Sequence, residues 1–171
     1  HQAPYIEAMY EKYMPADHPF RKEPPSTPAT RELTALTSAA ARACYPEASP
    51  ELKRRFLELT GVMMYLTHTT CHVAMLPVVK SAQCVGNPTE ALFEFQLRAL
   101  AYAYEHRFER NVMDARYGMQ LSCHVDADWD VDFSMAGWVI FCAGCVIAAG
   151  CKKIKCVCLS TTEAELVAAS M

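Results

Sequence analysis

The sequence lacks any long uninterrupted run of apolar residues. Its 171 residues are 52% hydrophobic, yet no stretch approaches the roughly 18 consecutive apolar residues that a membrane-spanning helix needs. It also lacks an excess of positive charge, since 20% of its residues are charged and its net charge is -3. A strongly basic surface is the usual electrostatic footprint of a nucleic-acid partner, so we do not expect a tail built for nucleic acid. No signal peptide is apparent, and because the chain begins with His1 rather than Met, we expect its original start to be missing.

Cysteine, by contrast, is abundant. The chain has nine cysteines, an odd number. Its length suffices for a hydrophobic core of its own, in one domain or in one domain plus a smaller piece. Disulfide frameworks are typical of short secreted chains with small cores, so we expect these cysteines to be mostly reduced and buried, in a reducing intracellular compartment.

The first two thirds of the sequence have helical patterns. We expect a short helix over Tyr5–Tyr13, with Tyr5, Ile6, Met9 and Tyr13 along one side. A proline-rich segment follows, and because proline fixes φ and removes donors, we interpret it as an extended linker or surface strap rather than as a ligand for a proline-binding module. The prolines of this segment are Pro15, Pro19, Pro24, Pro25 and Pro28.

Further helices are predicted over residues 31–44, from the cap residue Ser49, over 72–84, and from the cap residue Asn87. Ser49 is a good N-cap followed by Pro50 at the first helical position. Asn87, Pro88 and Glu90 fit a cap, a first-turn proline and a capping-box acid. The apolar stripe of the second helix is Leu52, Phe56, Leu59, Met63 and Leu66, and that of the last is Phe93, Leu97, Leu100 and Tyr104.

The pattern changes to strand periodicity after Gly118. Strands are predicted at 121–126, 138–142, 145–149 and 152–159, the first with Asp126 at its end on the polar face and the last with Ile154, Cys156 and Cys158 on one face. Ser160 then caps a helix that begins at Thr161. The expected fold class is therefore α+β, with helices first and a sheet with one helix after them.

Several motifs in this second part occur in an order that resembles a known family. They resemble the ribonuclease H region of copia-type LTR retrotransposon polyproteins, in which a D-A-D-W strand, a hairpin, a strand starting with paired lysines and an S-T-E-A-E helix follow one another. The matching segments are His124-Val125-Asp126-Ala127-Asp128-Trp129, Ser134-Met135-Ala136-Gly137-Trp138-Val139, Lys152-Lys153 and the run from Leu159 to Ser170.

Upstream segments are similar to other parts of the same polyproteins. Residues 58–66, Thr69-Thr70 and 87–91 resemble the helices that connect reverse transcriptase with ribonuclease H. Tyr5-Ile6-Glu7 and Thr27-Pro28 resemble the tail of the polymerase. The resemblance implies a polymerase-tail remnant and Pro-rich linker at 1–30, a helical connection region at 31–117, and a truncated ribonuclease H-like domain at 118–171 with an incomplete mixed sheet and one helix.

The chain also departs from the family pattern. Cys71-His72-Val73 stand where the family usually has Arg-Pro-Asp, and Ala149-Gly150-Cys151 stand where it usually has a tryptophan and a serine before the paired lysines. In such proteins the polymerase aspartates lie upstream of the segment that begins here at His1. The later ribonuclease H acids lie downstream of Met171.

The resemblance implies a metal-dependent chemistry at two carboxylates. Ribonuclease H uses two divalent cations about 4 Å apart, and such hard cations take oxygen ligands. The resemblance makes Asp126 the central Mg²⁺ ligand and Glu165 a second one. Glu163 stands three residues after Ser160 and is expected to be the capping-box acid of the helix. Read without the resemblance, Asp126 is a strand-end turn aspartate. Asp128 and Asp130 are interpreted as turn residues.

Two carboxylates cannot hold a pair of Mg²⁺ ions, and we expect the third aspartate to come from a further strand that this chain does not contain. We therefore expect the chain to be catalytically incompetent and to act as a non-catalytic structural or interaction subunit, with Mg²⁺ bound only if the site is completed elsewhere. Other protein subunits would then cover the open sheet edge and the apolar helices. The alternative is a fragment of an active enzyme that hydrolyses the RNA strand of an RNA–DNA hybrid.

Three other groups of residues are weaker candidates for a metal site or for contact with phosphate. A zinc site could be imagined from Cys142, Cys145, Cys151, Cys156 and Cys158, but the spacing is not a standard knuckle pair, and packing as small apolar residues is favoured. For His68, Cys71 and His72 a core or helix-end role is favoured over metal ligation. For Lys152, Lys153 and Lys155 an edge guard or solvated face is favoured over phosphate contact.

Overall fold

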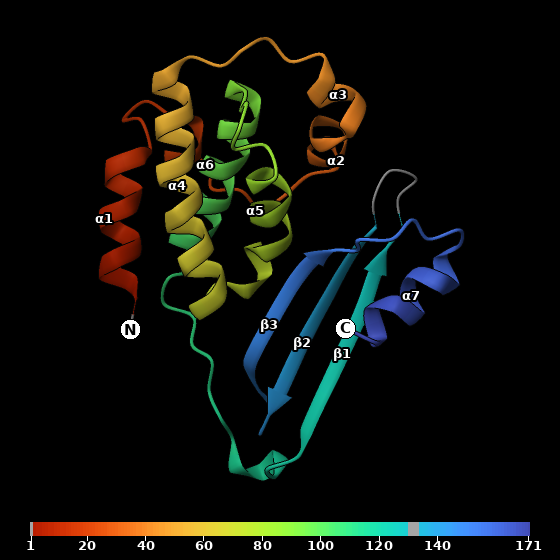
Figure 1. Cartoon of the computed structure of the whole chain (residues 1–171). Helices are drawn as coiled ribbons and strands as arrows, with labels where there is room; N and C mark the ends of the chain where they lie inside the picture. Colours follow the sequence, from red (N-terminus) through yellow and green to blue (C-terminus); the bar gives the residue numbers. More distant parts are fainter. Residues whose placement is uncertain (1, 130–133) are drawn as a thin grey trace. The chain divides into compact units, whose positions relative to one another are not determined.

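A computed structural model describes residues 2–129 and 134–171. The chain forms two compact units, the residues up to Glu109 and Arg110–Met171 (Figure 1). The first unit contains α1 (Ala3–Tyr13), η1 (Pro19–Arg21), α2 (Glu32–Thr37), α3 (Ala39–Ala43), α4 (Pro50–Thr69), η2 (His72–Ala74), α5 (Met75–Ala82) and α6 (Glu90–Glu105). The second contains η3 (Ala115–Tyr117), β1 (Leu121–Asp128), β2 (Met135–Cys142), β3 (Cys145–Lys153) and α7 (Thr161–Ala169). The expected α+β class with helices first is confirmed.

Helix α4 forms as its sequence predicts. The Ser49 hydroxyl accepts a hydrogen bond from the Leu52 amide at 3.1 Å, and Pro50 occupies the first helical position. The five apolar residues of the predicted stripe, Leu52, Phe56, Leu59, Met63 and Leu66, are all buried. Local capping and a 3.6-residue period thus specify both the start of α4 and the side that faces the core.

The start of α6 corrects one prediction. Thr89, not Asn87, caps this helix, because the Thr89 hydroxyl accepts from the Leu92 amide at 3.2 Å. The side-chain amide of Asn87 instead forms hydrogen bonds with the segment before α4. Its Oδ1 accepts from the Ala48 amide at 2.8 Å, and its Nδ2 donates to the Pro46 carbonyl at 3.1 Å. Asn87 therefore joins two loops that are distant in sequence.

The helix predicted over 31–44 is interrupted at Ser38. This residue has an extended backbone between α2 and α3, with φ -61° and ψ 152°. Its hydroxyl donates to the Ala35 carbonyl at 2.9 Å and accepts from the Ala41 amide at 3.2 Å. One side chain thus supports the end of α2 and caps the start of α3, which is why two short helices replace one.

The first helix belongs to the helical unit. Tyr10 of α1 stacks on Tyr104 of α6 with ring centroids 4.0 Å apart. Arg107 donates from Nε to the Glu7 carboxylate at 2.8 Å, while its guanidinium lies 4.0 Å from the centre of the Tyr104 ring. Aromatic stacking and a cation–π contact, reinforced by an ion pair, therefore attach α1 to the end of α6.

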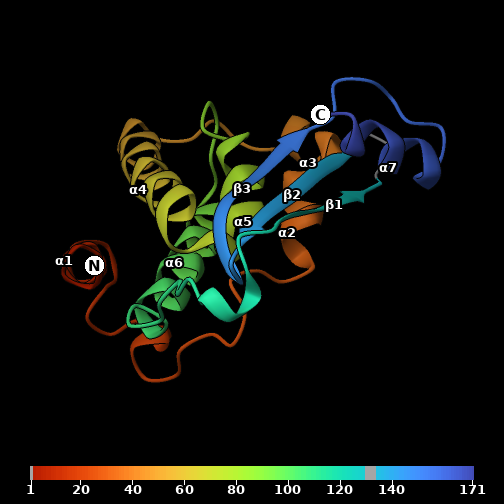
Figure 2. The same ribbon diagram turned by 90° about the horizontal axis from the view of Figure 1, so that it is seen from below.

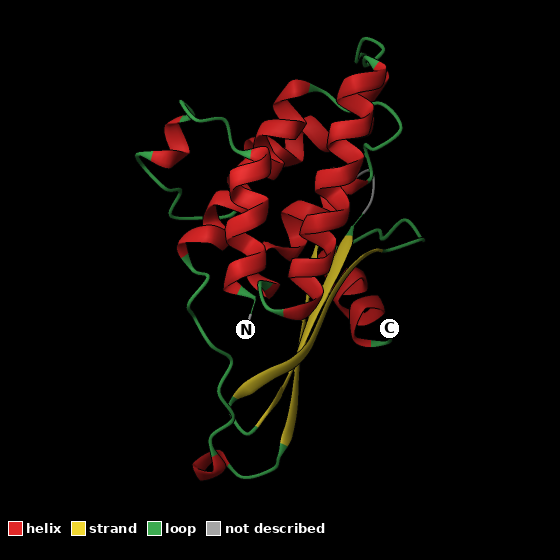
Figure 3. Ribbon diagram, turned by 90° about the vertical axis from the view of Figure 1, so that its left-hand side faces the viewer, coloured by secondary structure: helices red, strands yellow, loops and turns green. Residues whose placement is uncertain are grey.

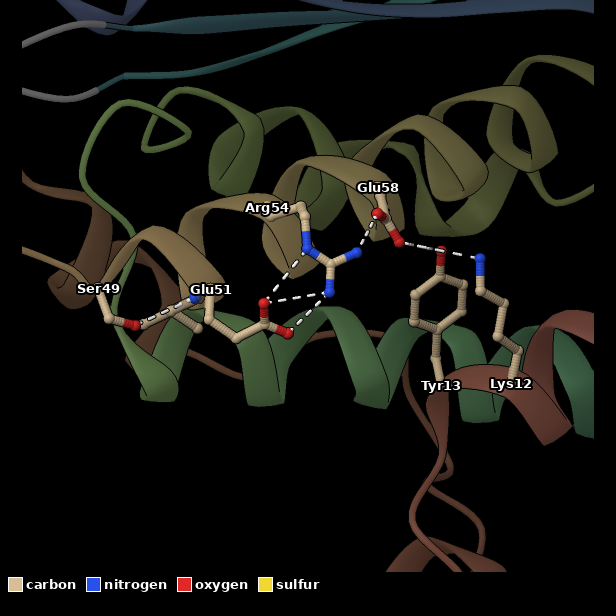
Figure 4. Close-up of polar contacts among 7 residues, drawn as sticks. Lys12, Tyr13, Ser49, Glu51, Arg54 and Glu58 are labelled. Atoms are coloured by element: carbon tan, nitrogen blue, oxygen red, sulfur yellow. Dashed lines mark hydrogen bonds and ion pairs between the residues drawn. The ribbon is translucent and has the colours of Figure 1, made fainter.

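Helices α1 and α4 also share a row of polar contacts (Figure 4). The Tyr13 hydroxyl donates to Glu58 at 3.3 Å, and Lys12 lies 3.8 Å from the same carboxylate. Arg54 joins Glu58 to Glu51 along α4, with a 2.8 Å contact to each. These charged groups are largely exposed, so solvent screens the pairs and they add little to stability, whereas the apolar stripes are buried in the core.

A buried polar contact joins three helices inside the first unit. Gln96 of α6 donates from Nε2 to the Thr60 hydroxyl of α4 at 2.6 Å and to the Ser81 hydroxyl of α5 at 3.3 Å. Those two hydroxyls donate in turn to carbonyls of their own helices. Such a connected polar group fixes the relative positions of the helices more specifically than apolar packing alone.

The second unit is built on a three-stranded sheet of order β1-β2-β3 (Figure 2). Both described pairings are antiparallel, so the mixed sheet implied by the family resemblance is not present among the described residues. The β2–β3 connection is the two-residue turn Ala143-Gly144, with φ values of 49° and 74°. Positive φ at both positions is the type I′ turn that matches strand twist, and so short a loop can join only antiparallel strands.

The prediction of a separate strand over 152–159 is wrong. Strand β3 continues to Lys153, and the Ile154 amide then donates to the Ser134 carbonyl at 2.8 Å before the chain leaves the sheet. Ile154 and Cys158 are buried, whereas Cys156 is exposed. The alternation of apolar residues here reflects burial beneath α7 rather than a strand face.

Helix α7 covers one face of the sheet (Figure 3). Its buried residues Ala164 and Ala168 form a core cluster with Ala136, Ile154 and Cys158. Ala127 of β1, which pairs with Ala136, packs against the same cluster. We call the side of the sheet that bears Ala127 and Ala136 the helix face, and the other side the opposite face.

Two glycines in the sheet provide a matched test of this packing. A Cβ added at Gly150 would overlap the ring of Trp138 on the neighbouring strand, whereas one at Gly137 would meet only the Gly150 carbonyl oxygen at 4.0 Å. We expect Gly150→Ala to lower the free energy of unfolding by about 1–3 kcal/mol through overpacking. Gly137→Ala should leave it unchanged or raise it by up to about 1 kcal/mol. Chemical denaturation followed by tryptophan fluorescence measures both, and equal effects would contradict the register.

Asn87 offers a second test. Asn87→Ala removes both bonds to the segment before α4, so we expect a loss of about 1–3 kcal/mol in the free energy of unfolding. Asn111, which is exposed, serves as control, since Asn111→Ala should change it by less than about 0.5 kcal/mol. Urea denaturation monitored by circular dichroism compares the two variants. A neutral Asn87→Ala would show that the loop bridge contributes nothing.

Candidate functional site

The two candidate metal ligands are both exposed and lie on different elements. Asp126 is near the end of β1 and pairs with Gly137 of β2. Successive strand residues point to opposite faces, and Ala127 packs on the helix face, so Asp126 lies on the opposite face. Glu165 lies in the second turn of α7, which covers the helix face. Asp126 and α7 therefore lie on opposite sides of the sheet.

This arrangement bears on the Mg²⁺ pair that the resemblance implies. A two-cation site needs several carboxylates directed at one point. Within residues 2–129 and 134–171, no group of three or more His, Cys, Asp or Glu side chains is placed to hold a metal ion. Asp126 and Glu165 as placed do not fit such a pair by themselves.

Glu163 has the capping role that was predicted for it. Its amide donates to the Ser160 hydroxyl at 3.2 Å, and its carboxylate accepts from the Leu159 amide at 2.6 Å. The second bond goes to the residue before the cap rather than to the cap itself, a small variation on the capping box. Glu163 thus stabilises the start of α7. The turn role expected for Asp130 falls outside the described residues.

The cysteines of the second unit fall into two pairs. Cys142 and Cys145 flank the Ala143-Gly144 turn, face each other across it in the strand register, and are buried. Cys156 and Cys158 are close enough for their side chains to hydrogen-bond, and burial, followed by the neighbouring Cys156, raises the pKa of Cys158. All nine cysteines are free thiols.

The histidines beside Cys71 bond to helix carbonyls. His68 Nδ1 lies 2.7 Å from the Met64 carbonyl oxygen, and His72 Nδ1 lies 2.8 Å from that of Thr67. The Thr67 carbonyl lies in the last turn of α4, where carbonyls lack helical partners, whereas the Met64 carbonyl lies about one turn earlier. Burial raises the pKa of the Cys71 thiol to about 11, against a smaller opposing effect of a backbone hydrogen bond with Ala74.

The lysines near the end of β3 differ in exposure. Lys152 and Lys155 are exposed, and Lys153 is half-buried. Lys152 and Lys153 end the edge strand β3, and Lys155 follows it. The strand also contains an irregularity, because the β2–β3 register shifts between Ile140 and Phe141 and leaves Ile147 without a direct partner. A bulge together with lysines is a common protection of a sheet edge.

Sequence reasoning missed the most exposed feature of the second unit, the strand β1. Every residue of β1 except Ala127 is exposed, and among the described strands it pairs with β2 alone. Its sequence, Leu121-Ser122-Cys123-His124-Val125-Asp126-Ala127-Asp128, contains no lysine or proline, and its register with β2 has no bulge. The alternation identified the strand, but only the pairing shows that it lies at an edge.

Comparisons with protein-family models, with curated proteins and with solved structures found no match for this chain. Across the described residues, no helix combines the length and the apolar character required to cross a membrane.

The raised pKa of Cys71 gives a test by chemical modification. At about pH 8 the exposed Cys44 and Cys123 should react with a thiol reagent much faster than Cys71, because only the thiolate reacts. The unfolded thiol ionises near pH 8.5 and the folded one near 11, so the unfolded chain loses this proton first. The Cys71 contribution to stability should therefore fall as pH rises from about 8.5 to about 11.

Peptide mass spectrometry measures the modification rates, and denaturation across this pH range measures the stability. Cys71→Ser should remove that part of the decline, whereas Cys44→Ser should not. Equal reactivity of Cys71 and Cys44 at about pH 8 would contradict the buried thiol.

Proposed function

We propose that this chain is a non-catalytic, retroelement-derived, ribonuclease H-like fragment that acts as a structural or interaction subunit of a larger assembly. The second unit supplies the binding surface. Its partner is another protein chain that covers the sheet edge at β1 and the apolar side chains around it.

The observation that carries this proposal is the distribution of large apolar side chains in the second unit. Leu121, Leu159 and Leu166 are 69%, 85% and 67% exposed, and Met119 is 78% exposed. Among the described residues, the core cluster beneath α7 has Ile154 as its only large aliphatic member. Several large exposed apolar side chains on a unit with so small a core favour a role in binding a partner.

The proposed ribonuclease H-like origin has a separate support. The motifs that resemble the copia-type region fall on β1, on β2, at the end of β3 and on α7, in the order strand, hairpin, strand, helix. Helix α7 also contacts β1 most closely among the strands. The three comparisons found no relative, so the origin rests on these motifs and their order alone.

The alternative function is hydrolysis of the RNA strand of an RNA–DNA hybrid by a longer enzyme of which this chain is a part. It is favoured by the exposure of both Asp126 and Glu165, since carboxylates at a metal site must be reachable by substrate. In that case further carboxylates would complete a site for Mg²⁺ with Asp126. Their addition would have to bring ligands to the opposite face of the sheet.

A cleavage assay separates the two functions. We expect the purified chain, incubated with a labelled RNA–DNA hybrid and Mg²⁺, to cleave no faster than its Asp126→Asn variant, because too few carboxylates converge to bind two cations. Asp17→Asn, which changes an exposed aspartate of the first unit, is the matched control. Mg²⁺-dependent cleavage that Asp126→Asn abolishes and Asp17→Asn leaves intact would overturn the non-catalytic role.

A further inference from the structure

The two edges of the sheet are not equivalent. The edge formed by β3 has a register irregularity at Ile147 and ends in two lysines, features that hinder the addition of another strand. The edge formed by β1 is eight residues long and regular. An open, regular edge presents unpaired N–H and C=O groups to any strand that can align with it.

The residues of β1 separate by face. His124 and Asp126 lie on the opposite face, where the His124 ring makes an edge contact with Phe141 at a centroid distance of 5.6 Å. Cys123, Val125 and Ala127 lie on the helix face, beside Ile140, Trp138 and Ala136 of β2. A strand that pairs with β1 therefore needs small apolar residues on one face and groups complementary to an imidazole and a carboxylate on the other.

β1 itself meets this requirement. When two copies of β1 run antiparallel about a twofold axis through Val125, His124 of each copy stands opposite Asp126 of the other. On the helix face, Val125 then meets Val125 and Cys123 meets Ala127. Histidine N–H groups can donate to the carboxylates in two symmetric pairs, and every apolar residue of this central row meets an apolar one.

We propose that the β1 edge binds a second copy of this chain, which forms a symmetric dimer with a continuous six-stranded sheet centred on Val125. This proposal rests on the proposed interaction role and specifies its partner. The twofold arrangement uses the same surface on both copies, which closes the assembly at two chains and leaves no β1 edge open.

Neighbouring registers are less complementary. An axis through Asp126 would place the two Asp126 carboxylates opposite each other, and like charges directly opposite destabilise a pair of strands. An axis through His124 would place the two imidazoles opposite each other and Asp126 opposite Ser122. The register through Val125 is the one of these three that aligns His124 with Asp126.

A charge exchange tests the proposed register in the full-length chain. H124D places a carboxylate opposite Asp126 of the second copy, twice per dimer by symmetry, and should weaken dimerisation at least about tenfold. The double variant H124D/D126H exchanges the two groups and should restore most of the wild-type affinity. N111D adds the same charge at an exposed residue of the second unit outside the sheet and should leave the dimer intact.

Sedimentation velocity over a wide concentration range measures the dimer, and circular dichroism verifies that each variant is folded. A folded wild-type chain that stays monomeric would overturn self-pairing and would leave a different protein as the occupant of the edge. Loss of the dimer in H124D without recovery in H124D/D126H would overturn the register. Neither result bears on the absence of hybrid cleavage, which tests the proposed function separately.

Discussion

The second unit depends on the contact between α7 and the helix face of the sheet. That contact is made by small side chains, Ala164 and Ala168 of the helix against Ala136 and Ala127 of the strands. Alanines allow the helix backbone to approach the sheet closely, but each buries little apolar area. A unit of roughly 60 residues has a small core in any case. The small apolar area buried in this contact therefore gives the second unit a small free energy of unfolding.

The remaining apolar side chains of this unit fit that constraint. Leu166 lies two residues from both Ala164 and Ala168 and therefore on the outer side of α7, and Leu159 precedes the helix, so both leucines are exposed. The first unit shows the contrary arrangement, with Phe56, Leu59, Met63 and Leu66 fully buried and a polar contact from Gln96 fixing three helices. The first unit therefore has the larger core, whereas the second leaves more of its large apolar side chains exposed.

Local signals could be read from the sequence where a residue and its partner are neighbours. Ser49 and Ser160 cap helices that begin one residue later, so α4 and α7 were predictable. Asn87 resembled a cap, but its partners are 39 and 41 residues away. The segment after Lys153 alternates like a strand, but burial beneath α7 explains Ile154 and Cys158. Asp126 was recognisable as a strand residue, while its position relative to α7 depends on which face the helix covers.

The Arg107–Glu7 pair has a consequence for how the chain folds during synthesis. Its partners are separated by 100 residues, so the helical unit can close only after Arg107 has left the ribosome. The strands of the second unit pair with their sequence neighbours, and such local contacts form quickly once the residues are available. The first residues of the helical unit must therefore wait for about 100 further residues to be synthesised before they can pack in their final positions. The sheet follows almost immediately, which shortens the time for which the β1 edge is present on a partly folded polypeptide.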